Sequence, residues 1–77
     1  MKNVKLKSEG NQFKVYVDDL IHITFIQAEF LGFQSWVKGT DWYCIEFHFN
    51  NKGRMLCEYT SKELWESILK EFDKFKF

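Results

Sequence analysis

The sequence predicts an α+β fold, in which an antiparallel, curled sheet of about five strands is followed by one C-terminal amphipathic helix. Three observations predict it. Apolar and polar residues alternate through most of the chain before Thr60, a glycine-containing turn lies at residues 50–54, and apolar residues recur at three- and four-residue spacing after Thr60. A chain of 77 residues has room for one core, so residues 1–77 are expected to form a single domain.

The N-terminal part is expected to form a hairpin and then a further strand. Segments 4–7 and 13–17 alternate between apolar and polar residues on either side of the turn residues Ser8-Glu9-Gly10-Asn11. Asp18-Asp19 is a second turn candidate, after which Ile21, Ile23 and Phe25 are expected to share one face. The N-terminal part is therefore predicted to form antiparallel strands with one solvent-exposed face.

A break in the apolar pattern precedes the central strands. Gln27-Ala28-Glu29 is expected to be a bend, a bulge or a break between strands, and residues 30–37 then continue extended. In the turn at Asn50–Arg54, Gly53 occupies the position that needs a left-handed residue. That turn sets Asn50 opposite Arg54 and pairs Phe49 with Met55, Phe47 with Cys57, and Ile45 with Tyr59. The turn at residues 39–41 pairs Phe33 with Phe47 and Leu31 with Phe49, with a two-residue shift left open.

The C-terminal helix is expected to begin with a capping box. The Thr60 hydroxyl can accept from the backbone N–H of Glu63, whose carboxylate can reach back. The apolar stripe that follows is expected to pack on the sheet face of Ile45, Phe47 and Phe49. It consists of Leu64, Trp65, Ile68, Leu69, Phe72 and Phe75.

Composition and charge argue against several classes of partner. Eleven basic residues balance eleven acidic ones, which argues against general affinity for the phosphate backbone of nucleic acid. No apolar run approaches the ~18 residues of a membrane span, so the chain is expected to be cytoplasmic, with no membrane partner. Cys44 and Cys57 are expected on opposite faces of one hairpin as reduced thiols.

The residues that could carry chemistry do not form a recognisable centre. Cys44 and His48 stand four apart on one strand, roughly 13 Å, and Cys57 is expected to point away, so no metal or other cofactor is predicted. Glu46 and His48 share a face, but strand neighbours two apart are separated by roughly 6 to 7 Å, which is too far for general-base catalysis. No catalytic residue is predicted, and the protein is expected not to be an enzyme.

One sheet face has more aromatic surface than a small core needs. Trp36, Trp42, Cys44, Glu46, His48 and Leu56, with Phe30 as a candidate member, are expected to point away from the helix. In one interpretation the N-terminal hairpin folds over this face, making a small barrel or sandwich. In the other, part of the face is open and forms an interface, as exposed aromatic patches commonly do.

The order of elements also resembles known small proteins. The segments Phe33-Gln34-Ser35-Trp36, Trp42 to Phe47, Asn51-Lys52-Gly53 and Glu63-Leu64-Trp65 look like small bacterial and phage-encoded proteins with a strand-rich body and a C-terminal helix. Their order is also similar to the closing part of a pleckstrin-homology-like fold, although the chain is too short for seven strands of normal length and lacks the basic loop of a phosphoinositide site. The resemblance implies a recognition module, of a kind that mobile elements encode.

The sequence therefore predicts a small non-enzymatic module that binds another protein, a second copy of itself, or both. The expected interface residues are Trp36, Trp42, Glu46, His48, Leu56 and Phe30. The alternative is a sensor or sponge that stacks a small ligand such as a nucleotide on a ring-lined sheet.

Overall fold

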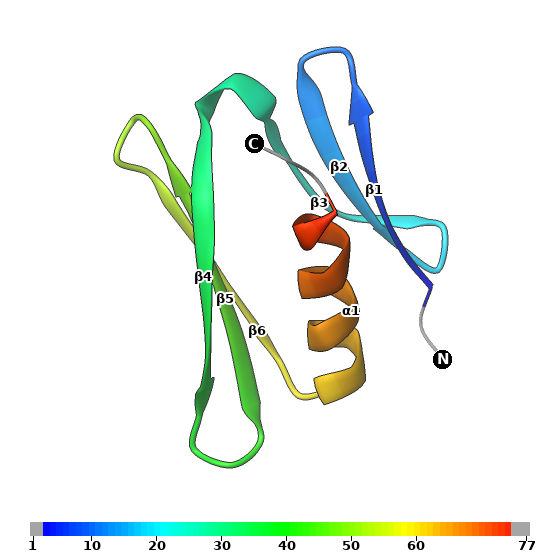
Figure 1. Ribbon diagram of the computed structural model, residues 1–77, viewed down its shortest axis with the longest axis vertical. Coiled ribbons are helices and arrows are strands. Elements are labelled where there is room, and N and C mark those ends of the chain that lie inside the picture. The colour runs from blue at the N-terminus through cyan, green and yellow to red at the C-terminus, as the bar shows by residue number, and fades with distance from the viewer. Residues whose placement is uncertain (1–2, 75–77) are drawn as a thin grey trace.

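The computed structural model describes residues 3–74, which form six strands and one α-helix (Figure 1). The chain order is β1 (Val4–Glu9), β2 (Gln12–Val17), β3 (Leu20–Ile26), a 3₁₀ turn (Gln27–Glu29), β4 (Phe30–Lys38), β5 (Trp42–Phe49), β6 (Arg54–Tyr59) and α1 (Lys62–Asp73). The predicted α+β class is confirmed. The strands do not form one curled sheet, however, because the 3₁₀ turn separates β3 from β4 and leaves two three-stranded antiparallel sheets.

The N-terminal sheet (β1–β3) contains both predicted turns. Asp18 and Asp19 both have positive φ, 51° and 68°, which gives the β2–β3 hairpin the backbone twist that tight hairpins favour. The β2–β3 register then shifts between Val15 and Tyr16, so that Ile21 lies opposite Tyr16. Ile21 is 56% exposed, and its predicted place on the buried face is wrong, because the bulge at His22 interrupts the alternation.

The C-terminal sheet (β4–β6) keeps the predicted faces with a changed register. Phe33 lies opposite Phe47 as predicted, but a bulge between Phe30 and Gly32 sets Phe30, and not Leu31, opposite Phe49. Between β5 and β6 the register is offset by two residues from the predicted one. The observed pairs are His48 with Arg54, Phe47 with Met55, Ile45 with Cys57, and Tyr43 with Tyr59.

The β5–β6 loop explains this offset. Its left-handed residue is Lys52, with φ of 67°, and not Gly53. The N–H of Phe49 donates to the carbonyl of Gly53 over 3.0 Å, while the Asn51 Oδ1 accepts from the N–H of Gly53 over 2.8 Å. The loop therefore spans residues 50–52, one position earlier than predicted. A shift of two residues preserves the faces, because side chains alternate with a period of two.

The helix packs on the predicted face of the C-terminal sheet. Ile68 and Phe72 are buried, and the Phe72 ring lies 5.2 Å from that of Phe47 and 5.4 Å from that of Phe33. The helix begins one residue later than predicted. Its N-cap is Ser61, whose hydroxyl accepts from the N–H of Leu64 over 3.2 Å, and not Thr60. Phe75, the last member of the predicted stripe, lies outside the described residues.

The two sheets share one core, and this decides which face is covered. Phe25 of β3 lies 5.9 Å from Phe47 of β5 and 6.2 Å from Phe72 of α1, measured between ring centroids. The N-terminal sheet and the helix therefore both lie on the Phe47 side of the C-terminal sheet (Figure 1). Within residues 3–74, the N-terminal hairpin does not fold over the opposite face.

Candidate functional site

The uncovered side of the C-terminal sheet, called the outer face below, is built from directly paired residues on three strands. Antiparallel partners present their side chains on the same side of a sheet. The observed register therefore groups the outer face as Gln34 and Trp36 on β4, Trp42, Cys44, Glu46 and His48 on β5, and Arg54, Leu56 and Glu58 on β6. Five of the six predicted interface residues lie on it.

The apolar part of the outer face is open to solvent. Trp36, Trp42 and Leu56 are 37%, 45% and 52% exposed, respectively. Trp36 lies opposite Cys44, whose side chain is only 1% exposed between its larger neighbours. Trp36 and Trp42 are thus the sheet neighbours of a small buried residue and expose part of their own surface to solvent.

Phe30 does not belong to this face. It is 8% exposed, and its ring lies 4.8 Å from that of Phe25 and 5.9 Å from that of Phe72. The bulge that follows Phe30 is the physical reason, because it places Phe30 opposite Phe49 on the inner side. Its assignment to the interface is withdrawn.

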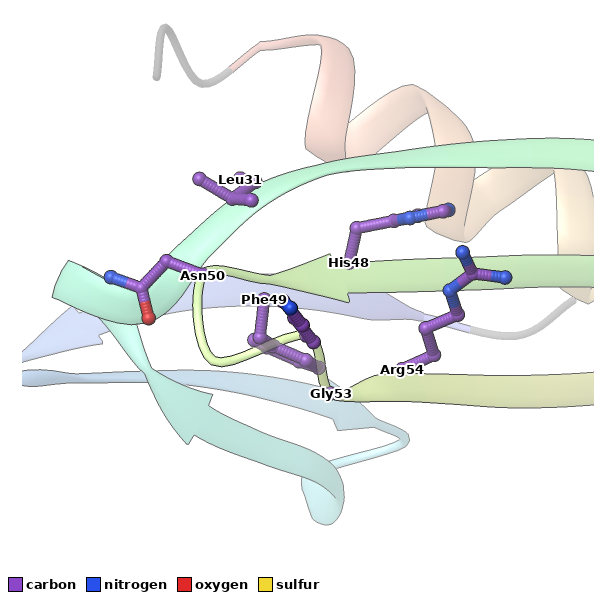
Figure 2. Close-up of a pocket in the computed structure, with 7 residues that line it drawn as sticks. Leu31, His48, Phe49, Asn50, Gly53 and Arg54 are labelled. Carbon is purple, nitrogen blue, oxygen red and sulfur yellow. The ribbon is translucent and has the colours of Figure 1, made fainter.

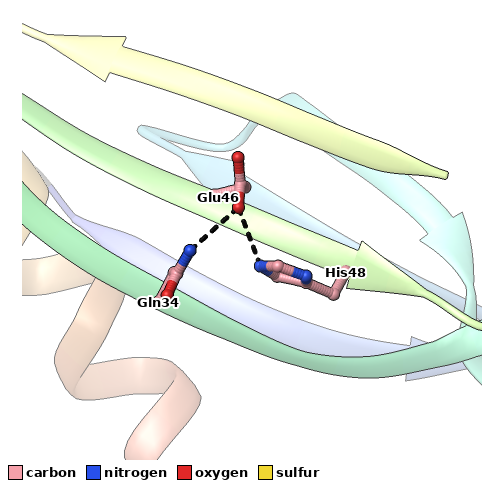
Figure 3. Close-up of polar contacts among 3 residues, drawn as sticks. All are labelled: Gln34, Glu46 and His48. Atoms are coloured by element: carbon pink, nitrogen blue, oxygen red, sulfur yellow. Dashed lines mark hydrogen bonds and ion pairs between the residues drawn. The ribbon is translucent and has the colours of Figure 1, made fainter. Parts of the chain in front are cut away.

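The middle of the outer face holds a connected polar group (Figure 3). The Glu46 Oε1 accepts from the Gln34 Nε2 over 2.9 Å and lies 2.9 Å from the His48 Nε2. The sequence argument that Glu46 and His48 stand too far apart is wrong, because their side chains lean together although their backbones are two residues apart. The contact fixes the orientation of both side chains.

This polar group does not assemble a catalytic set with the nearby thiol. Cys44 is four residues from His48 along β5, a separation of roughly 13 Å, and it is buried. A base must lie within hydrogen-bond distance of the group that it deprotonates. Among the described residues, no cluster of three or more metal-ligating side chains occurs.

A pocket of about 310 Å³ adjoins the polar group at the loop end of the outer face (Figure 2). Lys52 and Arg54 contribute two cations to its lining, and among residues 3–74 no acidic residue contributes. Arg54 is there because it pairs with His48, and Lys52 because it occupies the left-handed position of the loop. The pocket is therefore suited to an anionic group beside an apolar wall. The described residues that line it are Leu31, His48, Phe49, Asn50, Lys52, Gly53 and Arg54.

The remaining titratable groups of note lie between the sheets, away from the outer face. The His22 Nε2 lies 2.8 Å from the Tyr59 hydroxyl, and burial lowers the pKa of His22 while it raises that of Tyr59. Burial also raises the pKa of Cys57, which shares the inner side with Tyr59. Cys44 and Cys57 thus lie on opposite faces as free thiols, as predicted.

No protein family, curated protein or solved structure matches this chain. The described residues contain no helix with the length and apolar character required to cross a membrane.

The ring-lined inner side of the C-terminal sheet is filled by protein. Ile45 and Phe47 are fully buried beneath Phe25 and Phe72. This ring-lined side of the sheet, on which the alternative function would stack a ligand, is thus part of the core. Sequence reasoning missed Arg54 and the pocket, because the predicted register placed Arg54 opposite Asn50 and not opposite His48. It also missed Gln34, although the predicted pairing of Phe33 with Phe47 already sets Gln34 opposite Glu46. The sequence signal that could have indicated the pocket is the pair of cations, Lys52 and Arg54, at the end of the loop.

Proposed function

We propose that this protein is a small, non-enzymatic binding module that recognises another protein through the outer face. The observation that carries the proposal is the exposure of Trp36, Trp42 and Leu56 on a sheet whose other side already holds the helix and the N-terminal sheet. Tryptophan and arginine are the residues most enriched among interface hot spots, and contiguous exposed apolar patches commonly mark interaction sites.

The chemistry of the partner follows from the two ends of the outer face. Trp36 and Trp42 lie at one end, and Arg54 and Lys52 lie at the other, beside the pocket. Cys44, opposite Trp36, and His48, opposite Arg54, are separated by roughly 13 Å along β5. We expect the partner to place an apolar side chain on the indoles and a carboxylate about 13 Å away in the pocket.

The size of the face bounds the affinity. Three strands about 4.8 Å apart and eight residues long offer roughly 400 Å² of surface. That is about half of the ~800 Å² per partner of a standard interface, so binding is expected to be transient and in the micromolar range. The contact of the carboxylate with Arg54 should make binding weaken as salt increases.

A displayed library of random peptides, panned on the purified protein, tests the proposal. Selected peptides should combine an aromatic or aliphatic residue with Asp or Glu, and Trp42→Ala should weaken their binding at least tenfold. Arg54→Gln should weaken binding and flatten its salt dependence. Leu20→Ala is the matched control, because Leu20 is an exposed apolar residue of the N-terminal sheet.

Circular dichroism must show that each variant remains folded. Peptides that lose affinity on Leu20→Ala but not on Trp42→Ala would place the site elsewhere and refute the proposal. Peptides without acidic residues, bound equally at low and high salt, would contradict the role given to Arg54.

The nucleotide alternative has one supporting observation, the two cations that line the pocket. A phosphate could bind there, with the rings of Phe49 and His48 in the same lining as surfaces for a base, but Trp36 and Trp42 lie outside the pocket and would have no part in this function. Titration of the tryptophan fluorescence with a panel of nucleotides separates the two functions. A saturable change that Arg54→Gln abolishes would favour the nucleotide over the protein partner.

A further inference from the structure

The free edge of β4 presents backbone groups that no described strand satisfies. β4 pairs with β5 on one side, and within residues 3–74 no strand pairs with its other side. The N–H of Phe49 bonds toward β6, so the odd-numbered residues of β5 bond to β6 and the even-numbered ones bond to β4. By the observed β4–β5 register, the N–H and C=O groups of Phe33, Ser35 and Val37 therefore point away from the sheet.

The side chains of β4 lack the features that usually prevent another strand from pairing with a free edge. From Phe30 to Val37 the strand has no charged residue and no proline, and Val37 is 47% exposed. Native edge strands are ordinarily protected by charge, proline, a bulge or a covering element. The bulge of β4 lies at its start, and the pairing from Gly32 to Lys38 is regular.

The other strand edges in the described part of the chain are protected. β3 has its bulge at His22, in mid-strand, and the side chain of His22 contacts Tyr59 of β6. The two remaining edge strands carry charges, which are Lys5, Lys7 and Glu9 on β1, and Arg54 and Glu58 on β6. The absence of such protection is therefore specific to β4.

We propose that β4 pairs with β4 of a second copy of this chain, antiparallel, to make a six-stranded sheet across a two-fold axis. Ser35 is the midpoint of the regular segment Gly32–Lys38, so pairing about Ser35 gives the greatest overlap. It sets Phe33 opposite Val37 and Trp36 opposite Gln34 of the other copy. The outward-pointing groups of residues 33, 35 and 37 then meet one another, as hydrogen-bonded pairs of an antiparallel ladder require.

A second copy fits this edge because the pairing is free of like-charge contacts. In an isologous interface each residue near the axis faces itself or a close neighbour. Self-pairing of β1 would bring Lys5 and Lys7 near lysines of the other copy, whereas the charged residue of β4, Lys38, lies at the end and far from its equivalent. The two outer faces would lie on the same side of the joined sheet and form one larger surface.

The interface is small, which sets the strength of the dimer. The seven paired residues of Gly32–Lys38 at about 3.3 Å each, over a depth of about 10 Å, give roughly 230 Å² per copy. This is less than half of a standard interface, so the dimer is expected to form in the high-micromolar range and above. The proposal does not depend on the partner protein proposed above.

Amide hydrogen exchange of the unmodified protein, measured at about 10 µM and about 1 mM, is the first test. Exchange at the amides of Phe33, Ser35 and Val37 should slow several-fold at the higher concentration, while the amides of Gln34 and Trp36, which bond to β5, should keep their rates. Sedimentation should show the mass rising toward twice that of the monomer over the same range. A monomer at every concentration, with unchanged exchange at all five amides, would overturn the proposal.

Variants of Ser35 locate the contact. Ser35→Pro removes an outward N–H, and Ser35→Lys places two lysines opposite each other at the axis, so each should abolish dimerisation. Ser35→Ala keeps the N–H and should dimerise like the unmodified protein. If Ser35→Pro fails to fold, Ser35→Lys decides. A dimer that survives Ser35→Lys, or that Trp42→Ala abolishes, would assign self-association to another surface and overturn the proposal.

Discussion

Phe72 is the side chain through which the helix joins both sheets, and its removal tests the placement of the core. It is 1% exposed, and its ring lies 5.2 Å from Phe47 of β5 and 6.2 Å from Phe25 of β3. Truncation of a buried Phe to Ala costs about 3 to 5 kcal/mol. A 77-residue domain has a total stability of about 4 to 12 kcal/mol, so Phe72→Ala should remove between about a quarter and all of it.

Phe72→Leu is the variant suited to measurement. It keeps most of the apolar volume but loses the aromatic contacts, at a cost of about 1 to 1.5 kcal/mol. For a domain of this size, that corresponds to a fall in Tm of about 4 to 12 °C. Urea denaturation, followed by circular dichroism, gives the free energy of unfolding for each variant.

Leu56→Ala is the matched control on the outer face. Its side chain is already 52% exposed, so its truncation should cost no more than about 1 kcal/mol. If Leu56→Ala destabilised the protein as much as Phe72→Ala, the outer face would be part of a core and the assignment of the two faces would be wrong.

Further predictions concern the turns and His22, whose ring contacts Tyr59 at the edge of the shared core. Asp19→Gly should raise the free energy of unfolding by about 0.5 to 1 kcal/mol in urea denaturation, because Asp19 has φ of 68°. Lys52→Gly should stabilise the protein by a similar amount, because Lys52 also has a positive φ. Gly53→Ala should destabilise it, because the new Cβ would lie 2.7 Å from the Asn51 Oδ1. Stabilisation by Gly53→Ala would contradict the observed loop. Burial lowers the folded-state pKa of His22 below its ordinary value of 6.5. The stability that neutral His22 contributes is therefore present above pH 6.5 and is lost as the pH falls through the folded-state pKa. Unfolding free energies at pH 7 and pH 5 should therefore differ less in His22→Gln than in the unmodified protein.

The sequence predicted the elements and faces well because both follow from periodicity. Alternation located the strands, and the three- and four-residue spacing located α1 with Ile68 and Phe72 on its buried side. The faces of β5 and β6 survived a register error of two residues because the side-chain period is two. The N-cap was misplaced by one position because Thr60 and Ser61 both carry a hydroxyl that can cap a helix.

The register itself depended on backbone conformations that residue preferences did not reveal. Lys52 adopts a left-handed conformation that favours glycine, while the neighbouring Gly53 does not use it. The bulge at His22 changes which way the side chains point while the residues themselves, Ile21-His22-Ile23, still alternate, so the sequence pattern does not mark it. At Phe30-Leu31 two apolar residues are adjacent, and the pattern does not decide which of them faces the core. As a result, the indoles of the outer face could be predicted from the sequence, but the placement of Arg54 and the burial of Phe30 could not.

The succession of elements along the chain also bears on how the protein reaches its folded state. Each strand pairs only with a strand adjacent to it in sequence, so both meanders can close through short loops soon after they are synthesised. Their phenylalanine-rich sides are in contact with each other, but the core that they share is complete only when α1, which follows the six strands, adds Ile68 and Phe72. Stopped-flow refolding should therefore resolve early strand formation from a later helix-docking step, and a nascent chain released before residue 61 should be prone to aggregate.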